Sequence, residues 1–341
     1  MKVTLALLLG MIPVAGAQTQ QAPHAMYYRT GAAADVVGHP RAGYALMGGG
    51  TDLDEAFRWL CDHADGGDLL VLRASGDDAY NPYIRGLCKL NSVATLVIPD
   101  REAALDPSAS GRIQKAAAIF ISGGDQSKYT RYWRGTPVEA GLRDAVKRGI
   151  PIGGTSAGLA VLGEYIYSAE NDRPNDDDLK SETALADPFY RQVVVAPDLL
   201  GIPILRGIIT DTHFDTRHRE GRLLVFMARI LASGPATEIR SIGVDEKTAL
   251  LVEPDGSSRV VGMGEVDFFV VQGKPAVCEP GQPLQIGMNA IQEQQVHAGE
   301  SFDLKTWQGS GRIYAVSVIW TNGQPVIAMT PGPWVHSEAN R

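Results

Sequence analysis

Residues 149–162 read GIPIGGTSAGLAVL, and this stretch decides the fold. A short apolar run leads into the pattern Gly-x-Ser-x-Gly, with Ser156 at its centre. The residues that follow, Leu159 to Leu162, are suited to open a helix. A strand, a sharp turn and a helix in this order predict a nucleophile elbow, in which the turn exposes a serine hydroxyl at the end of a strand.

The glycines around Ser156 have a physical reason. A serine on so sharp a turn sits in strained backbone, and side chains on its neighbours would clash. The turn also aims the backbone N–H of Ala157 at a developing oxyanion. The alternative is an ordinary glycine-rich turn in a chain with 38 glycines. A nucleophile needs a base, and the base needs an orienting acid, so the rest of the chain has to supply both.

Short apolar runs alternate with helical patterns upstream of Ser156. We expect strands at 44–47, 69–72, 94–98 and 118–121, and helices at 54–64, 112–117 and 138–147. This alternation predicts an α/β fold with a parallel sheet covered by helices on both faces. Ligands of such sheets bind beyond the carboxyl ends of the strands. The glycine run at 48–50 lies there too, but it lacks the Gly-x-Gly-x-x-Gly spacing of a dinucleotide loop.

A second stretch, residues 208–224, is dense in reactive side chains. An apolar strand leads into Asp211 and His213, which lie on one face of it at a period of two. His213 is therefore expected at a strand end, near the sheet edge that carries Ser156. That is a suitable place for a general base.

Three arginines follow His213 within ten residues: Arg217, Arg219 and Arg222. Guanidinium groups suit two-point recognition of carboxylates, so the cluster predicts a binding site for an anionic substrate. The alternative is a network of surface ion pairs with Glu220 and nearby acids.

Metal chemistry is a rival interpretation of the same stretch. Asp211, His213 and Asp215 alternate and could face one ion. The chain has no His-Glu-x-x-His motif and no second cluster of ligands, and a metal would leave the serine elbow unexplained. We therefore predict no metal site.

Three motifs together resemble cyanophycinase and its relative dipeptidase E, serine peptidases with a class I glutamine amidotransferase-like fold. The motifs are Gly123-Gly124-Asp125-Gln126, residues 153–158, and Asp211-x-His213-Phe214-x-x-Arg217-x-Arg219-x-x-Arg222-Leu223, in family order. The resemblance is clear from about Gly43 to Gly273 and weak to about Trp307. It implies a peptidase domain over residues 41–274, followed by a β-rich C-terminal extension over residues 275–341.

The resemblance implies a role for each catalytic residue. Ser156 is the nucleophile and His213 the base, while Gly124 and Ala157 supply oxyanion N–H groups. In the family an acid follows the elbow and precedes the histidine. That order points to Glu182 as the triad acid, with Asp172 in reserve.

The resemblance also implies a substrate. Cyanophycin has a poly-aspartate backbone with arginine on each side-chain carboxyl, and the family enzyme releases β-Asp-Arg dipeptides. The expected substrate-binding residues are Gln126, Asp125, Asp211, Arg217, Arg219 and Arg222. The arginines would hold aspartyl carboxylates, and Asp125 or Asp211 would receive the substrate's arginine. No cofactor is implied, and a homodimer is expected only because relatives form one.

Other functions stay open at this point. The nearest is an aspartyl or isoaspartyl dipeptidase without activity on the polymer. A non-catalytic homologue that binds aspartyl peptides would keep the elbow without productive geometry. The acidic insert at 170–180 and the tail from Gly309 onward depart from the family, and both put the substrate in doubt more than the reaction.

The N-terminus and the overall charge bound the location and the partners. Residues 1–17 are typical of a signal peptide: Lys2, an apolar run from Val3, and the small residues Ala15-Gly16-Ala17. We expect cleavage after Ala17 and a secreted or periplasmic protein without a membrane anchor, because the apolar run is too short to span a bilayer. The net charge of −8 argues against nucleic acid as the main partner.

Three smaller features complete the sequence. Cys61 and Cys88 are the pair expected to bridge if any does, and buried free thiols are the alternative. We expect residues 18–40 to be an irregular linker. The polar stretch at 170–188 predicts a long solvated acidic loop rather than a calcium site.

Overall fold

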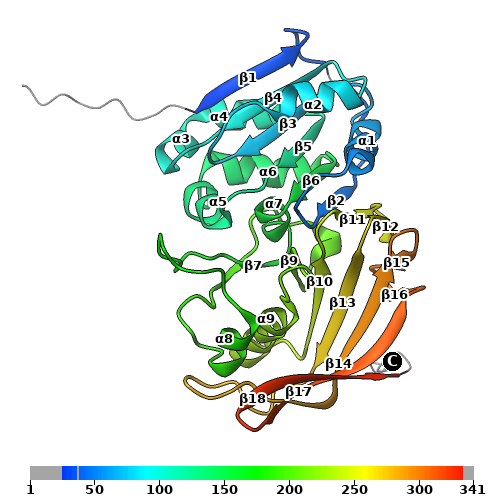
Figure 1. Cartoon of the computed structure of the whole chain (residues 1–341). Coiled ribbons are helices and arrows are strands. Elements are labelled where there is room, and N and C mark those ends of the chain that lie inside the picture. The colour runs from blue at the N-terminus through cyan, green and yellow to red at the C-terminus, as the bar shows by residue number, and fades with distance from the viewer. Residues whose placement is uncertain (1–24, 37, 333–341) are drawn as a thin grey trace, which may run out of the picture.

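The computed structural model describes residues 25–36 and 38–332. The expected signal peptide at residues 1–17 and its cleavage point after Ala17 lie outside them. Within the described residues, no helix is both long and apolar enough to cross a membrane. Figure 1 shows two β-sheets, here called sheet A and sheet B, with the strands of the chain's first half in the upper part of the view and the C-terminal strands in the lower part.

Sheet A holds ten strands in the order β1-β4-β3-β5-β6-β2-β11-β12-β15-β16. Five neighbours at its centre, β4, β3, β5, β6 and β2, run parallel. The strands are β1 (Met26–Gly31), β2 (Tyr44–Met47), β3 (Asp68–Arg73), β4 (Ser92–Val97), β5 (Ala118–Ile121), β6 (Ile152–Thr155), β11 (Thr248–Val252), β12 (Ser257–Gly262), β15 (Ser301–Asp303) and β16 (Gln308–Gly309).

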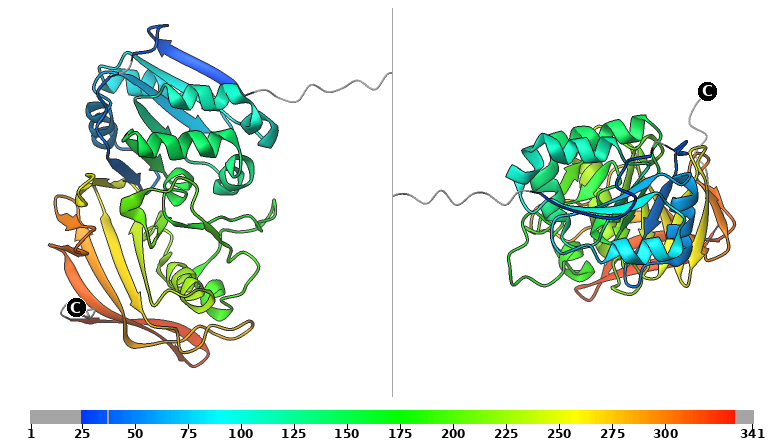
Figure 2. Two further views of the ribbon diagram at one scale, coloured as in Figure 1. Left: turned by 180° about the vertical axis from the view of Figure 1, so that it is seen from behind. Right: turned by 90° about the horizontal axis from the view of Figure 1, so that it is seen from above.

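Helices cover both faces of this parallel region, as Figures 1 and 2 show. Alternate side chains of β3 divide between two cores: Leu70 packs with residues of α3, α4 and α6, and Leu69 with residues of α1 and α2. The helices are α1 (Asp54–His63), α2 (Tyr80–Leu87), α3 (Arg101–Leu105), α4 (Pro107–Gln114), α5 (Gln126–Trp133), α6 (Pro137–Lys147), α7 (Ala157–Ala160), α8 (Ser181–Ala186), the 3-10 turn η1 (Pro203–Leu205) and α9 (Glu220–Ser233). The predicted α/β class is confirmed.

Sheet B holds eight strands in the order β18-β17-β14-β13-β10-β9-β7-β8. β7, β9 and β10 are parallel, and the others pair antiparallel. The strands are β7 (Tyr165–Tyr167), β8 (Val195–Pro197), β9 (Ile208–Thr212), β10 (Glu238–Val244), β13 (Glu265–Gln272), β14 (Ile286–His297), β17 (Arg312–Thr321) and β18 (Gln324–Pro331).

The C-terminal extension completes both sheets instead of packing as a separate body. Its strand β14 pairs along β13 in sheet B, and β15 pairs with β12 in sheet A. A turn at Asn322-Gly323 joins β17 to β18, with φ of 50° and 74° at its two residues. The β-rich character of this region is confirmed.

The described part of the region expected to be a linker, residues 18–40, differs from that prediction, and residues 18–24 and 37 lie outside the described residues. Residues 26–31 form β1, which pairs antiparallel with β4 at the edge of sheet A. Tyr27, Tyr28 and Thr30 favour extended backbone, and this signal was outweighed by the polar residues around them. The helix expected at 112–117 lies at Pro107–Gln114, where Asp106 caps it by accepting a hydrogen bond from the Ser108 N–H.

The structure also decides whether Cys61 and Cys88 form a disulfide or are free thiols. Cys61 on α1 and Cys88, directly after α2, form a disulfide. It ties together the two helices that cover one face of the parallel strands. Cys278 is a free thiol and partly buried.

Candidate active site

Ser156 lies at the turn between β6 and α7, with the geometry of a nucleophile elbow. Its φ is 51° and its ψ −119°, a conformation that side chains disfavour. The flanking glycines make the turn possible, because a Cβ on Gly154 would collide with the Gly158 carbonyl, and a Cβ on Gly158 with the Ile121 carbonyl. The predicted elbow is present.

His213 follows a strand of sheet B and contacts Ser156, which follows a strand of sheet A. It follows β9 directly, and its backbone N–H donates to the Gly48 carbonyl, which fixes the strand end against sheet A. The Ser156 Oγ and the His213 Nε2 are 2.7 Å apart. Burial lowers the pKa of His213 below its usual value, the hydrogen bond with Glu246 opposes this, and the charges of Arg217 and Arg219 add to the lowering. The ring is therefore neutral at pH 7 and able to accept the serine proton.

The acid beside His213 is Glu246, not Glu182. The His213 Nδ1 lies 2.5 Å from the Glu246 Oε1, so the Nδ1 proton is donated to the carboxylate and Nε2 faces the serine. Glu182 lies on α8 and lines a different cavity, which does not include Ser156. Asp172 lies in the pocket of Ser156, but its carboxylate accepts a hydrogen bond from Gln192.

Glu246 was missed because the family resemblance directed attention to the segment between Ser156 and His213. A topological signal was available. β10 is the parallel neighbour of β9, with Val244 paired to Thr212. The residues that follow two such strands meet at the same edge of the sheet, which places Glu246 beside His213.

The two expected oxyanion donors border the same cavity as Ser156. Gly124 and Ala157 both line this pocket of about 290 Å³, called here the catalytic pocket. Gly124 has a φ of 140°, which favours glycine, and a Cβ on Gly123 would lie 3.5 Å from the Ser156 Cβ. The Gly123-Gly124 loop therefore approaches the nucleophile closely from the end of β5.

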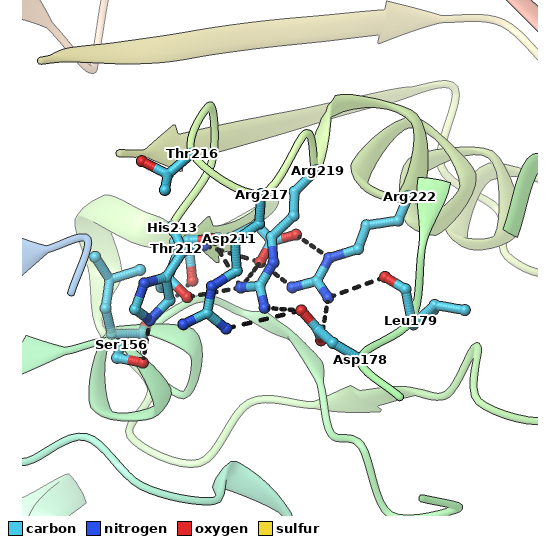
Figure 3. Close-up of polar contacts among 12 residues, drawn as sticks. Ser156, Asp178, Leu179, Asp211, Thr212, His213, Thr216, Arg217, Arg219 and Arg222 are labelled. Carbon is cyan, nitrogen blue, oxygen red and sulfur yellow. Dashed lines mark hydrogen bonds and ion pairs between the residues drawn. The ribbon is translucent and has the colours of Figure 1, made fainter. Parts of the chain in front are cut away.

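The arginine cluster forms an ion-pair network beside the catalytic pocket (Figure 3). Arg222, 2% exposed, places its Nε and Nη2 at 2.8 and 2.6 Å from the two carboxylate oxygens of Asp211. Arg219, 6% exposed, pairs with Asp178 and donates to the Thr212 carbonyl. Arg217 is about half exposed and lies 3.7 Å from Glu246 and 3.8 Å from Asp178.

This network corrects the expected roles of two arginines. Arg219 and Arg222 are already paired with carboxylates of the chain itself, and Asp211 is paired with Arg222. Burial opposes ionisation of Asp178, yet the charges of Arg222 and Arg219 hold its pKa below the usual range. Of the three arginines, Arg217 has the most exposed side chain. Asp178 of the acidic insert thus supplies the carboxylate that binds these arginines, whereas we had expected a carboxylate of the substrate in this position.

The remaining predicted residues border the catalytic pocket from α5. Gln126 is the first residue of this helix, and Asp125 caps it by accepting a hydrogen bond from the Ser127 N–H. Both line the pocket. Asp215, the third residue of the metal alternative, lies in the other cavity with Glu182. In the part of the chain that the structure describes, no three side chains of His, Cys, Asp or Glu are grouped to hold a metal ion.

Comparisons with known proteins agree with the motifs. Residues 96–260 match the family described as Peptidase family S51. A cyanophycinase of Synechococcus elongatus is 34% identical over 226 residues, which cover 64% of this chain and 62% of that protein. A cyanophycinase of Geminocystis herdmanii (strain PCC 6308) is 29% identical over 223 residues, covering 62% of this chain and 72% of that protein.

The match is partial in length. The chain spans less than two thirds of the Synechococcus relative. Among solved structures, the crystal structure of a peptidase from an acI-B1 Actinobacterium aligns with a TM-score of 0.49 at 20% identity, covering 78% of this chain and 98% of that one. The sequence comparisons confirm the expected resemblance: over residues 96–260, this chain is similar to the cyanophycinase-like serine peptidases of family S51.

Proposed function

We propose that the chain is a serine peptidase that cleaves aspartyl or β-aspartyl peptide bonds through Ser156, His213 and Glu246. The observation that carries this is the continuous hydrogen-bonded series from Ser156 Oγ to His213 to Glu246, at the edge of a pocket. The matches to cyanophycinases support the choice of bond.

The geometry supports a two-step reaction. His213 Nε2 takes the proton of Ser156 as Oγ attacks the carbonyl carbon, and the N–H groups of Gly124 and Ala157 face the oxyanion. Protonated His213 then gives its proton to the leaving amine, which leaves an acyl-enzyme on Ser156. Water, deprotonated by the same nitrogen, hydrolyses this ester and restores the serine. Glu246 holds the imidazole in the required tautomer throughout.

The polymer cyanophycin is the substrate that we propose first, with β-Asp-Arg dipeptides as products. Arg217 would hold a substrate carboxylate, because its guanidinium is the accessible one in the cluster. The paired state of Arg219 and Arg222 favours the alternative of a small aspartyl dipeptide, which needs fewer carboxylate contacts. Assays on insoluble cyanophycin and on β-Asp-Arg, Asp-Leu and isoaspartyl-leucine side by side separate the two.

Export is part of the proposal. The signal-like residues 1–17 predict it, and the disulfide between Cys61 and Cys88 supports it, since disulfides persist in oxidising compartments. N-terminal sequencing of the protein from culture medium or periplasm should begin at Gln18. A chain that stays in the cytoplasm with Met1 retained would contradict this.

The test of the catalytic proposal is Ser156→Ala. We expect kcat to fall by at least about 1000-fold on whichever peptide the wild type cleaves, because the acyl-enzyme cannot form. The variant should keep the wild-type circular dichroism. Unchanged turnover by the purified, folded variant would rule out the triad.

A further inference from the structure

A second cavity lies on the other side of the loop that follows His213. It has a volume of about 330 Å³ and is bordered by α8, the start of α9, and strands β13, β14 and β18. Six carboxyl groups line it, and we call it the acidic cavity: Glu182, Asp215, Glu220, Glu265, Asp267 and Glu293. None of the roles in the proposed reaction uses these groups.

Two of the carboxyls are deeply buried on adjacent strands. Asp267 on β13 is opposite Gln295, and Glu293 on β14 is opposite Phe269, so the two acids are diagonal neighbours on one face of sheet B. Each is 2% exposed. They lie close enough that the charge of Glu293 raises the pKa of Asp267.

These carboxyls lack the donors that normally accompany buried acids. Within the described residues, the buried Oδ1 of Asp267, Oε2 of Glu293 and Oε1 of Glu220 receive no hydrogen bond from an N–H or hydroxyl group. The side-chain amide of Gln295 donates to the other oxygen of Glu293. A buried carboxyl in this state costs free energy that a donor of opposite charge would offset.

The electrostatic surroundings of these carboxyls also favour a bound cation. Burial raises the pKa of Glu220 to about 8 and that of Glu293 to about 7, and it raises the pKa of Asp267 well above its usual value. The charges that act on these three groups are those of other carboxylates, including Glu265. Arg219 borders the cavity, but its guanidinium is held by Asp178 and Asp211 on the catalytic side.

The aromatic and apolar residues that line the acidic cavity indicate which kind of cation it would bind. The ring of Phe214 and the apolar side chains of Leu185, Pro325 and Ile327 line the cavity beside the acids. A guanidinium group stacks on an aromatic ring and presents five N–H donors in a plane, while an aliphatic stem packs on apolar walls. This combination suits a guanidinium on a short hydrocarbon chain better than a compact, strongly hydrated ion.

We propose that the acidic cavity binds a small organic cation of the guanidinium class, at a site separate from the catalytic pocket and built in part by the C-terminal extension. The guanidinium lies among Glu220, Asp267 and Glu293. Its donors satisfy the buried carboxylate oxygens, and binding releases the protons that these groups hold without the ligand.

The test is calorimetric titration of agmatine into the full-length Ser156→Ala chain at pH 7. Agmatine carries the guanidinium without a carboxylate, so it has no anionic group for the arginine cluster. We expect saturable one-to-one binding, with proton release seen as an enthalpy that depends on the ionisation heat of the buffer. N-carbamoylputrescine, in which an uncharged urea replaces the guanidinium while the terminal ammonium is kept, should bind at least about tenfold more weakly.

Variants locate the site. Glu220→Gln and Glu293→Gln should each weaken agmatine binding by about tenfold or more, while Glu102→Gln on the exposed surface of α3 should leave it unchanged. Far-ultraviolet circular dichroism confirms that each variant is folded, and Glu220→Gln serves if the more buried substitution does not fold. Absence of saturable binding, equal affinity for N-carbamoylputrescine, or equal affinity in the Glu220→Gln variant would overturn the proposal. Because the nucleophile is already removed, none of these results depends on the peptidase activity.

Discussion

The catalytic pocket and the acidic cavity lie on opposite sides of one short segment, residues 214–220, and they treat buried charge in opposite ways. On the catalytic side Asp211 and Asp178 meet Arg222 and Arg219 directly. On the other side the charges that act on Asp267 and Glu293 are those of other carboxylates, and Gln295 gives Glu293 only a neutral amide donor. The same residue type is thus ionised in one place and holds a proton in the other.

The difference teaches what each region is prepared for. Arg219 and Arg222 are paired with carboxylates of the chain. Arg217 is therefore the arginine beside Ser156 that can still bind an anion. In the acidic cavity, the acids without a partner of opposite charge favour a positively charged ligand. A ligand that fills one region has the opposite sign to a ligand that fills the other, although Arg219 borders both.

The largest expected effect is on kcat, and it distinguishes an acid of the catalytic pocket from an acid of the acidic cavity. Glu246→Gln should lower kcat by about 100- to 10,000-fold, because an amide cannot accept the His213 Nδ1 proton in the same way and the tautomer is lost. Glu182→Gln should keep kcat within about tenfold of wild type, since Glu182 lies in the acidic cavity. Steady-state kinetics on the preferred peptide measure both. The opposite ranking would restore Glu182 as the triad acid.

The next effect tests the pairing on the catalytic side. Arg222→Met should destabilise the fold by about 3–5 kcal/mol, because it leaves Asp211 buried without its bidentate partner. Chemical denaturation followed by circular dichroism gives the change in free energy of unfolding. The double variant Arg222→Met with Asp211→Leu should recover part of the loss. A single variant as stable as wild type would show that the ion pair contributes little.

A smaller effect tests the acidic cavity through pH. A carboxyl whose pKa is raised on folding contributes stability below its unfolded pKa of about 4.5, and this contribution is lost as the pH rises through the folded pKa. For Glu220 that value is about 8. Glu220→Gln should therefore gain stability relative to wild type between pH 5 and pH 8, seen as a Tm difference that grows by a few degrees, on the order of 2–4 °C per kcal/mol. A Tm difference that is constant with pH would contradict the raised pKa.

The smallest effect concerns the acid limb of the pH–rate profile. The pKa of His213 is lowered, mainly by burial, so the neutral imidazole persists below the usual histidine value of about 6.5. The value of kcat/KM should thus fall only at a pH below about 6.5. Replacing Arg217 with Gln should move this limb upward, because one of the charges that lowers the pKa is removed. An acid limb above pH 7 in the wild type would contradict the lowered pKa.

The sequence predicted most of what local pattern controls. The elbow at Ser156, the strand end at His213 and the parallel strands of sheet A follow from glycine placement and apolar runs, and the structure has all of them. Each of these features is decided by neighbours within a few residues.

What the sequence did not reveal depends on which strands become neighbours. Glu246 reaches His213 only because β10 lies beside β9, and Asp178 reaches the arginines only because the acidic insert folds back over them. Asp267 and Glu293 are 26 residues apart in the chain and meet through the register of β13 and β14. Charge pattern alone suggested free arginines, whereas long-range pairing had already assigned two of them a partner.

The pairing of β2 with β11 joins Tyr44–Met47 to Thr248–Val252, two segments separated by most of the chain. During synthesis β2 leaves the ribosome early, yet one of its two edges has no partner until residues 248–252 follow. Sheet B is completed later still, because β14, β17 and β18 are the last three of its strands to be synthesised. The nascent chain therefore spends most of its translation with open strand edges, so premature termination near the C-terminus should yield an aggregation-prone product rather than a smaller working enzyme.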